Sequence, residues 1–344
     1  MQAKAIFGQT LATNLIAVTR DPSELTAGWW AVLQTFDGDF YGFRFNQITD
    51  DSRDFLTNYQ GTCTIAEESW SSSLSQVEYE AGVEKIRDYI SQGWVYQTNY
   101  CRVLSANLST PFDCLALLKS IRAHNPAPFA SGLFIPQSES KLTHDIRIAS
   151  ASPELFLRRS GDEIQSSPIK GTAGLAQQML DKDSAENVMI VDLIRNDISH
   201  VCLPGSVKVP ELMRLENHPG LTHLVSDVTG QLKPNTSWSQ ILKALMPPGS
   251  VSGAPKSSSL KVIDELEPVS REVYCGYIGW IDVDNSQAQL AVAIRTFWQS
   301  FSDSNVVKFG TGAGITYSSD PRGEWRETEL KASHLLKVAS GSDH

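Results

Sequence analysis

The chain has 344 residues, of which 41% are hydrophobic and 20% charged, a composition typical of a folded globular protein. Its formal net charge of −10 argues against a broad binding surface for the phosphate backbone of nucleic acids. The five cysteines are scattered without a C-x-x-C pair, so they predict neither a disulfide framework nor a zinc ribbon.

Targeting and membrane signals are lacking in the sequence. The N-terminus has no continuous apolar segment followed by a cleavage site, and no stretch approaches the roughly 18–20 apolar residues that a membrane span needs. Together with the unpaired cysteine pattern, this predicts a cytoplasmic protein without membrane association. No linker rich in Pro, Gly or Ser divides the chain, and we therefore expect one domain over residues 1–344.

The first half of the chain predicts strands with helices between them. Residues 1–65 mix short apolar runs with turn signals, as antiparallel strands do. Apolar residues at helical spacing predict helices over 77–91 and 115–121. Further strands are expected at 94–100, 133–136 and 146–149.

The second half contains more helical segments, again separated by strands. Helices are expected at 185–201, from 237 onward, at 255–266 and from Asp320-Pro321 to about 338, and strands at 223–231, 274–283, 290–298 and 306–315. Residues 210–218 have the composition of a loop. Strands in hairpin order with helices grouped between them predict an α+β sandwich rather than βαβ repeats.

The last predicted helix presents two acids and a base on one face. Glu324, Glu327 and Lys331 follow one another at i, i+3 and i+7. Two carboxylates one turn apart can ligate a hard cation such as Mg²⁺, and the lysine can then meet the carboxylate of a bound anion. From spacing alone, an ordinary solvated Glu–Lys pair is the more common explanation.

Two further charged residues have one functional and one structural interpretation each. Glu186 lies at the predicted start of a helix, either as a third metal ligand or as an acid favoured by the helix dipole. Lys170 lies between Pro168-Ile169 and Gly171, either as a surface turn residue or as a nucleophile. The nucleophile requires a lowered pKa, which burial or a neighbouring cation would provide.

Two glycine-rich runs, 247–256 and 310–314, offer backbone N–H groups to an anion or form tight turns. Neither run matches a P-loop or a Rossmann fingerprint, so nucleotide binding is not indicated. Arg295 lies in a predicted apolar strand, where it needs an anionic partner from the protein or from a ligand. His223, at the head of a strand, is more often a structural histidine than a catalyst.

The order of several short motifs identifies a family. The motifs are Ser152–Phe156, Pro168–Thr172, Ala185–Asn187 with Val191–Asp197, Ser250–Lys256, Ile263–Pro268, Ile294–Thr296 and Gly312–Ile315 with Glu327-Thr328. In this order they resemble the chorismate-utilising enzymes, which include anthranilate, aminodeoxychorismate, isochorismate and salicylate synthases. The resemblance covers residues 78–338, so that residues 1–77 form a shortened N-terminal strand region.

The resemblance implies a fold and a set of roles. The fold has two large, mostly antiparallel sheets packed between helical layers, with the site in a cleft. Glu186 and Glu327 resemble the Mg²⁺ ligands, Glu324 acts through water, and Glu154 resembles the acid that protonates the departing C4 hydroxyl. The implied substrate-binding residues are Thr172, His223, Ser250, Tyr274, Arg295, Gly312, Ala313, Gly314 and Lys331.

Two positions sort the members of this family. Members that add water at C2 carry a lysine where this chain has Gln97, and anthranilate synthases carry alanine where it has Lys170. The resemblance therefore favours aminodeoxychorismate synthesis, in which Lys170 adds covalently at C2. Two alternatives remain: anthranilate synthesis on the same fold, and a catalytically silent protein that binds an aromatic metabolite.

The resemblance also implies the partners. Chorismate is the expected substrate, and no glutamine amidotransferase segment is found in the sequence. We therefore expect ammonia to come from a separate amidotransferase subunit in a heterodimer, or from solution. The loop between Lys170 and Glu186 is shorter than in longer family members, which bears on how the site closes.

Overall fold

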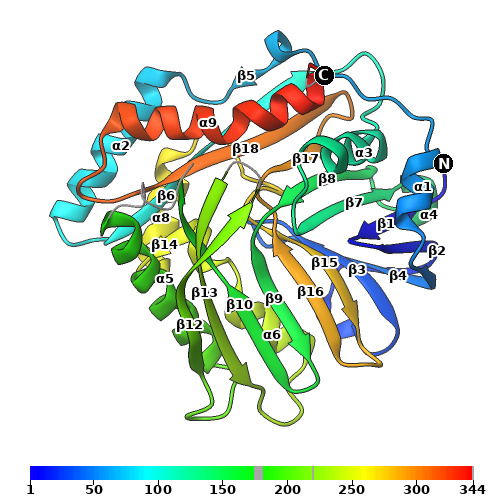
Figure 1. The fold of residues 1–344 in the computed structure, drawn as a ribbon, viewed down its shortest axis with the longest axis horizontal. Coiled ribbons are helices and arrows are strands. Elements are labelled where there is room, and N and C mark those ends of the chain that lie inside the picture. The colour runs from blue at the N-terminus through cyan, green and yellow to red at the C-terminus, as the bar shows by residue number, and fades with distance from the viewer. Residues whose placement is uncertain (174–180, 219–220, 343–344) are drawn as a thin grey trace.

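Antiparallel strands and surrounding helices make up the fold (Figure 1). The computed structural model describes residues 1–173, 181–218 and 221–342, and of 171–173, 181–185, 217–218 and 221–223 it describes the backbone alone.

Eighteen strands are present in the described residues. They are β1 (Lys4–Phe7), β2 (Thr10–Thr19), β3 (Trp29–Gln34), β4 (Phe40–Thr49), β5 (Ser71–Ser72), β6 (Gln97–Asn107), β7 (Phe129–Ile135), β8 (Ile146–Ser152), β9 (Leu155–Ser160), β10 (Glu163–Ser167), β11 (Ile169–Ala173), β12 (Lys208–His218), β13 (Leu221–Gln231), β14 (Gly253–Ala254), β15 (Tyr277–Asp282), β16 (Gln287–Val292), β17 (Thr296–Gln299) and β18 (Val306–Ile315).

Helices connect and cover these strands. They are α1 (Ser52–Asn58), α2 (Gln76–Ser91), α3 (Cys114–His124), α4 (Gln137–Ser140), α5 (Asp181–Ser199), α6 (Trp238–Leu245), α7 (Gly249–Ser252), α8 (Lys256–Leu266) and α9 (Pro321–Ser340), with short 3₁₀ turns η1 (Pro22–Glu24) and η2 (Glu67–Ser69). Local sequence explains several of their ends. A capping box of Ser75 and Glu78 starts α2, and Asp320 caps α9, which ends at Gly341 with φ +72°.

All strand pairs are antiparallel, and they join into one continuous, curled sheet. Neighbouring strands follow the order β14–β6–β18–β17–β8–β7–β1–β2–β4–β3–β15–β16–β9–β10–β13, and β11 and β12 also pair with β13. The predicted α+β antiparallel class is confirmed, with the two expected sheets joined edge to edge. Strands of the N-terminal region take part directly, because β1 pairs with β7 and β3 with β15.

Helices cover the sheet at both ends of this strand order. α9 packs against α2, α3 and β18, whereas α5 packs against β11 and β13 (Figure 1). Buried apolar side chains form three clusters, and the smallest, with Tyr79, Val83 and Ile86, lies between α2 and the β6–β18 pair. Helix α2 therefore buries the face that its 3.6-residue periodicity predicted.

Three sequence predictions were wrong in detail. Residues 210–218 were expected to be a loop but belong to β12, a charged strand whose pairing with β13 shifts register twice and includes Met213 at φ +58°. The strand expected over 290–298 is broken between β16 and β17, where Arg295 has φ +52°. Helix α5 begins at Asp181, so Glu186 lies in its second turn and not at its start. Register breaks and positive φ values depend on contacts with neighbouring strands. The spacing of apolar residues along the sequence carries no information about those contacts.

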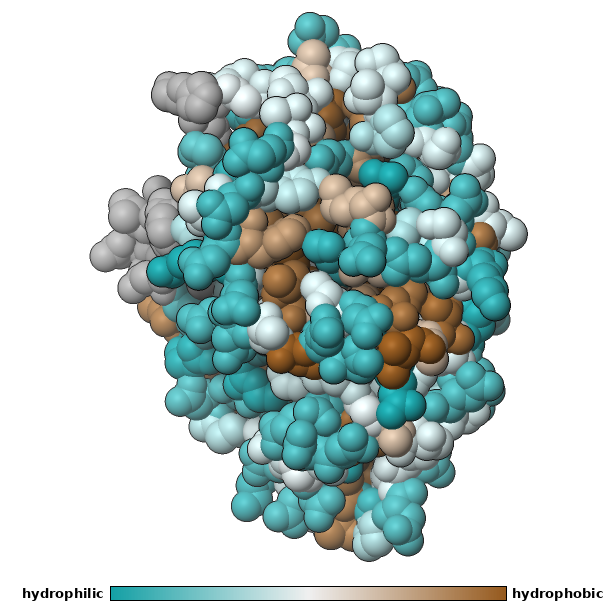
Figure 2. Space-filling model, turned by 90° about the vertical axis from the view of Figure 1, so that its right-hand side faces the viewer, coloured by the Kyte–Doolittle hydropathy of each residue, from teal (hydrophilic) through white to brown (hydrophobic). Residues whose placement is uncertain are grey.

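The surface viewed from the side of α1, α3 and the N terminus is mainly hydrophilic, with apolar groups showing near the middle of that face (Figure 2). None of the helices in the described part of the chain is both long and apolar enough to cross a membrane.

Candidate active site

A cavity of about 810 Å³ collects most of the residues singled out from the sequence. β6, β11, α5, α7, the β16–β17 break, β18 and α9 all contribute to its wall. Its charged lining residues include Glu154, Lys170, Glu186, Arg295, Arg326, Glu327 and Lys331. A concave site with several convergent charged groups suits a small polyanionic ligand.

Glu154 lies at the turn between β8 and β9 and is only 4% exposed. Burial raises its pKa to about 7, although the Ser250 side chain, the charge of Lys170 and the Ile169 backbone each act in the opposite direction. A carboxyl group with a pKa near neutral pH can donate a proton to a leaving group and take one back. The geometry therefore suits Glu154 as a general acid.

Lys170 lies in an irregular part of β11. Ile169 pairs with Val225 and Thr172 with His223, so β11 advances three residues while β13 advances two. The extra residue is a β-bulge, which redirects side chains out of the regular alternation. Lys170 lines the cavity from this bulge.

The cavity wall also changes the acidity of Lys170. Burial lowers its pKa, the Glu186 carboxylate opposes that shift, and the Lys331 ammonium lowers the pKa further. A lysine with a lowered pKa has more of the neutral amine that attacks carbon. The side chains of Thr172 and His223 lie outside the described residues, and only their strand pairing is established.

Glu186 and Glu327 face the cavity from two different helices. Gln97 Nε2 donates to Glu186 Oε2 at 3.3 Å, and Lys331 Nζ lies 2.6 Å from Glu327 Oε1. The Glu–Lys pair that spacing suggested is thus present, but it lies on a cavity wall. Glu324 is buried one turn before Glu327 and is not among the residues that line the cavity.

A magnesium ion requires oxygen ligands and usually binds one or two carboxylates together with waters and substrate oxygens. Glu186 and Glu327 fit that donor set. Within the described residues, no group of three or more His, Cys, Asp or Glu side chains is arranged as a preformed metal site.

Arg295 and Tyr274 supply the polar groups for an anion. Arg295 projects from the β16–β17 break and forms no ion pair with a carboxylate in the described part of the chain. Burial lowers its pKa. The Tyr274 ring lies against Gly310, where an added Cβ would come within 2.1 Å of the ring. Sequence context left a protein acid and a ligand as the two possible partners of Arg295, and its place on the cavity wall is compatible with the second.

The second glycine-rich run does not form a turn. Gly312 and Gly314 lie within β18, opposite Cys101 and Asn99 of β6, and both line the cavity. Lys331 Nζ donates to the Gly312 carbonyl at 3.0 Å. Ala313 packs away from the cavity, in the apolar cluster beneath α2. A Cβ would come within 2.5 Å of Cys101 Sγ at Gly312 and within 2.4 Å of Gln97 Nε2 at Gly314, so the packing against β6 requires glycine at both positions.

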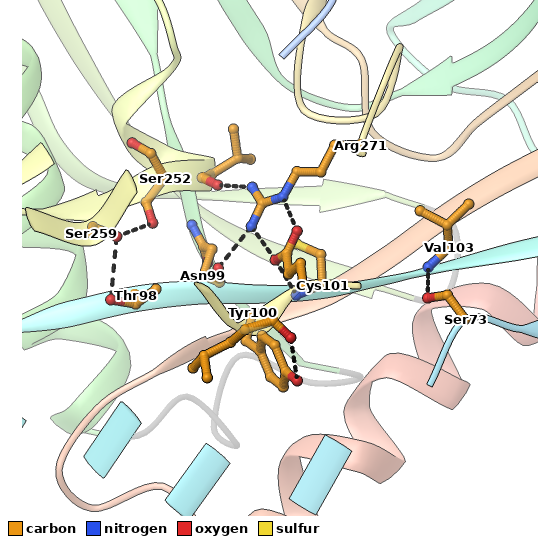
Figure 3. A network of polar contacts seen from close by, with 12 residues as sticks. Ser73, Thr98, Asn99, Tyr100, Cys101, Val103, Ser252, Ser259 and Arg271 are labelled. Atoms are coloured by element: carbon orange, nitrogen blue, oxygen red, sulfur yellow. Dashed lines mark hydrogen bonds and ion pairs between the residues drawn. The ribbon is translucent and has the colours of Figure 1, made fainter. Parts of the chain in front are cut away.

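Sequence reasoning missed the groups that support this site. Asn99, Glu267 and Arg271 have buried polar side chains that connect β6 with the α7 turn. Figure 3 shows how Arg271 and Asn99 lie toward one another. Glu267 stood within a quoted motif, and Arg271 follows it at i+4, the spacing of a helical ion pair. The i, i+4 spacing could have predicted the ion pair between Glu267 and Arg271. Only the fold shows that this pair contacts the backbone of Cys101 in β6 and of Val251 in α7.

Comparisons with known proteins show which sequences and folds this chain is similar to. Residues 56–337 match the family described as chorismate binding enzyme. Anthranilate synthase component 1 of Saccharolobus solfataricus is 36% identical over 284 residues, covering 79% of this chain and 64% of that protein. Aminodeoxychorismate synthase component 1 of Escherichia coli is 36% identical over 282 residues, covering 78% and 59%. The chain spans about three fifths of the length of these curated relatives.

Solved structures give the same fold. An isochorismate synthase, DhbC, from Bacillus anthracis superposes with a TM-score of 0.80 at 21% identity, covering 98% of this chain and 96% of that one. Anthranilate synthase component I from Streptococcus pneumoniae superposes with a TM-score of 0.77 at 23% identity, covering 98% and 93%. At this level of identity the likeness establishes the fold.

Proposed function

Because this chain belongs to the chorismate binding enzymes, we propose that it converts chorismate and ammonia to 4-amino-4-deoxychorismate. The observation that carries this proposal is the position and acidity of Lys170. It lines the cavity from a β-bulge, and burial lowers the pKa of its side-chain amine. Curated relatives include both aminodeoxychorismate and anthranilate synthases at similar identity, so the choice between the two reactions depends on this lysine.

Substrate binding follows from the charges of the cavity. Chorismate carries two carboxylates, and Arg295 and Lys331 supply cations on different walls. Tyr274, Ser250 and the backbone at Gly312 and Gly314 add hydrogen-bonding groups around the ring. Placing a dianion between separated cations fixes its orientation as well as its position.

Glu186 and Glu327 would hold a Mg²⁺ ion in this site. Such an ion supplies Lewis-acid stabilisation to the ring carboxylate. Lys331 and Lys170, which now offset the charges of the two glutamates, would remain close to the bound substrate.

The proposed chemistry uses two residues of the chain directly. The neutral amine of Lys170 forms a bond to C2, the ring double bonds shift, and the C4–O bond breaks. Glu154 gives its proton to the departing hydroxyl, which leaves as water. Ammonia then adds at C4, its extra proton returns to Glu154, and the double bonds shift back as the lysine is expelled. Two easier displacements replace one difficult one.

The ammonia source is a separate question from the chemistry of the cavity. We propose that a glutamine amidotransferase subunit supplies it in the cell, with free ammonia as the substitute in the test tube. Anthranilate synthesis is the second candidate because the Saccharolobus relative carries that name. In that reaction ammonia itself would add at C2, and Lys170 would have no covalent role.

A product assay distinguishes these reactions. Purified protein is incubated with chorismate, Mg²⁺ and ammonium at alkaline pH, and the products are separated and identified by mass spectrometry. Aminodeoxychorismate that becomes p-aminobenzoate only after a lyase is added supports the proposal. Anthranilate would establish the second candidate, and no product with bound chorismate would overturn both under these conditions.

A further inference from the structure

A buried arginine of β6 contacts the middle of α9. Arg102 is only 2% exposed, and its Nε donates to the Thr328 hydroxyl of α9 at 3.0 Å. Its two terminal nitrogens donate to Glu329 and, at 3.1 Å, to the Ser72 hydroxyl of β5. The guanidinium carbon also lies over the Trp325 ring, 4.1 Å from the ring centroid. One side chain of the sheet thus contacts three residues within about one turn of α9.

The neighbouring strand β18 binds the same helix residue. Thr311 of β18 lies directly opposite Arg102 in the strand pairing, so both side chains leave the same face of the sheet. The Thr311 hydroxyl donates to the Thr328 carbonyl at 2.8 Å. Arg102 therefore binds the side chain of Thr328, and Thr311 binds its main chain.

Thr328 would be a poor choice for this position if α9 only packed against the sheet. It is fully buried, and its β-branched side chain carries a hydroxyl, which is less favourable in a buried helix than an apolar group. The hydroxyl accepts from Arg102 and donates to the Trp325 carbonyl at 2.8 Å. These polar contacts, and not apolar packing, account for a threonine here.

The charge of Arg102 has an equally specific explanation. The Glu329 side chain is 56% exposed, so water screens its attraction for the guanidinium and little of the cost of burying that charge is offset. A buried arginine supplies instead a planar set of donors with fixed directions. A lysine has one ammonium group on a flexible chain and cannot bind Ser72, Thr328 and Glu329 together.

The contacts of Thr328 fix the rotation of α9 about its own axis. Successive residues of an α-helix point about 100° apart, so the direction of Thr328 sets the directions of Glu327 and Lys331. Thr328 faces the sheet, whereas Glu327 and Lys331 line the cavity. The carbonyl of Gly312, which follows Thr311 in β18, accepts from Lys331 Nζ at 3.0 Å. The same strand therefore contacts α9 on its buried face and at the cavity.

We propose that Arg102 is a positioning residue, which acts through Thr328. It fixes the rotation of α9 and so directs Glu327 and Lys331 into the cavity. The inference deepens the proposed function, since it rests on Glu327 holding Mg²⁺ and on Lys331 holding a substrate carboxylate. Neither Arg102 nor Thr328 is among the described residues that line the cavity, so both act on bound groups through α9.

The test measures Mg²⁺ binding by titration calorimetry, in the presence of chorismate and without ammonium. Arg102→Lys retains a cation but loses the planar donor set. It should weaken Mg²⁺ binding by about 10-fold, within the range for residues that orient a metal ligand. Thr328→Val retains the branched side chain without its hydroxyl and should act in the same direction. Because both changes break the same hydrogen bond, the double variant should lose less affinity than the product of the two single losses.

A second double variant shows whether Arg102 acts through Glu327. Glu327→Gln removes the carboxylate that the rotation of α9 directs into the cavity. Adding Arg102→Lys to this variant should weaken Mg²⁺ binding further by less than about twofold. A general loss of stability would instead give the same added loss with or without the Glu327 carboxylate.

Arg147→Lys is the matched control. Arg147 of β8 also pairs with a carboxylate, that of Asp145, at 2.8 Å, and donates to the Phe112 carbonyl at 3.0 Å. It lies over the Phe134 ring, as Arg102 lies over a ring of α9. Arg147 is not among the described residues of the cavity wall. Arg147→Lys should leave Mg²⁺ binding unchanged, whatever it costs in stability to urea.

Unchanged Mg²⁺ binding in folded Arg102→Lys and Thr328→Val would overturn the proposal. So would an equal loss in Arg147→Lys, or losses that simply multiply in the two double variants. If Arg102→Lys does not fold, Thr328→Val decides the question alone and in combination with Glu327→Gln.

Failure of the proposed function gives a different pattern. If the wild type forms anthranilate while the Mg²⁺ results hold, the positioning role stands and the reaction assignment fails. If Glu327→Gln leaves Mg²⁺ binding unchanged, the metal role of Glu327 fails, and the chorismate dissociation constant decides through Lys331. Arg102→Lys should raise that constant by about 3-fold to 10-fold, since a hydrogen bond to a charged group is weakened and not removed. An unchanged constant would then overturn the positioning role as well.

Discussion

Two walls of the cavity are built in different ways. The wall of β6, β18 and α9 is regular: β18 pairs with β6 over ten consecutive residues, and α9 is capped at its first turn. The wall of β11 and α5 is irregular, since β11 contains a bulge where it pairs with β13, and the pairing of β12 with the same strand β13 shifts register twice. The regular wall carries Glu327, Lys331 and the glycines, and the irregular wall carries Lys170.

The two walls differ in where they can direct their side chains. A regular strand alternates its side chains strictly, so small residues on every second position of β18 leave one flat face for a ligand. A bulge breaks that alternation and points one side chain where the regular strand would not. A regular strand face therefore suits groups that hold the substrate, and a bulge suits a side chain such as Lys170 that must reach the reacting atom.

The largest expected effect comes from removing the reacting group of the irregular wall. Lys170→Ala should lower aminodeoxychorismate formation by on the order of 10³-fold or more, because the covalent step is lost. Product formation measured by mass spectrometry checks this, and intact-protein mass spectrometry of the wild type with chorismate should show a covalent adduct that the variant lacks. Lys170→Arg, which retains a cation without a nucleophilic amine, should be equally inactive. Normal turnover in either variant would remove the nucleophile role.

Glu154→Gln should reduce turnover by about 10²–10⁴-fold, the usual contribution of a positioned acid. Because the neutral carboxyl group donates the proton, the fraction of wild-type enzyme able to do so falls as pH rises through about 7. The protonated form of Glu154 therefore predominates below about pH 7 and is lost on the alkaline side. A pH profile of kcat/KM should contain this ionisation in the wild type and not in the variant. A profile that keeps it would assign the ionisation to another group.

On the regular wall, Glu327→Gln should weaken Mg²⁺ binding in the presence of chorismate by about 10-fold to 100-fold, the range for groups that hold or orient a metal. Titration calorimetry measures it directly. Glu324→Gln is the control, because Glu324 lies one helical turn away and does not line the cavity. This variant should weaken Mg²⁺ binding less than Glu327→Gln does. Equal losses in the two variants would mean that Glu324 contributes as much as Glu327.

The smallest expected effect is on the packing of the regular wall. Gly310→Ala places a Cβ within 2.1 Å of the Tyr274 ring, so the ring must move or the strand must shift. Overpacking of this kind costs about 1–3 kcal/mol in unfolding free energy. Thermal or urea unfolding checks the cost, and Gly8→Ala, which meets nothing within 4 Å but has φ +56°, separates backbone strain from the clash. A larger loss at Gly8 than at Gly310 would contradict this account.

Local patterns predicted the regular elements well. The apolar spacing of α2, the start of α6 at Ser237 and the Asp320-Pro321 start of α9 placed these helices to within a few residues, because such signals lie in adjacent turns. The same reasoning failed for β12 and for the strand around Arg295. The many charged residues of β12 give it the composition of a loop. The strand break at Arg295, where φ is +52°, leaves no mark in the apolar sequence around it.

The candidate site was predicted by motif order and not by any single residue. Spacing placed Glu324, Glu327 and Lys331 on one helix face, but the fold separates them: Glu327 and Lys331 line the cavity, and Glu324 does not. Ala313, grouped with the glycines around it, turns to the opposite face because side chains alternate along β18.

Sequence alone determined the fold class, the family resemblance and most of the residues that meet in the cavity, since these depend on periodicity and on the order of motifs along the chain. Tertiary structure decided which of them have altered chemistry. The pKa values of Glu154 and Lys170 depend on burial and on charges brought from distant segments, and the contacts of Arg271 with Val251 and Asn99 join residues that lie far apart in the sequence. Desolvation and long-range contacts exist only once the chain is folded.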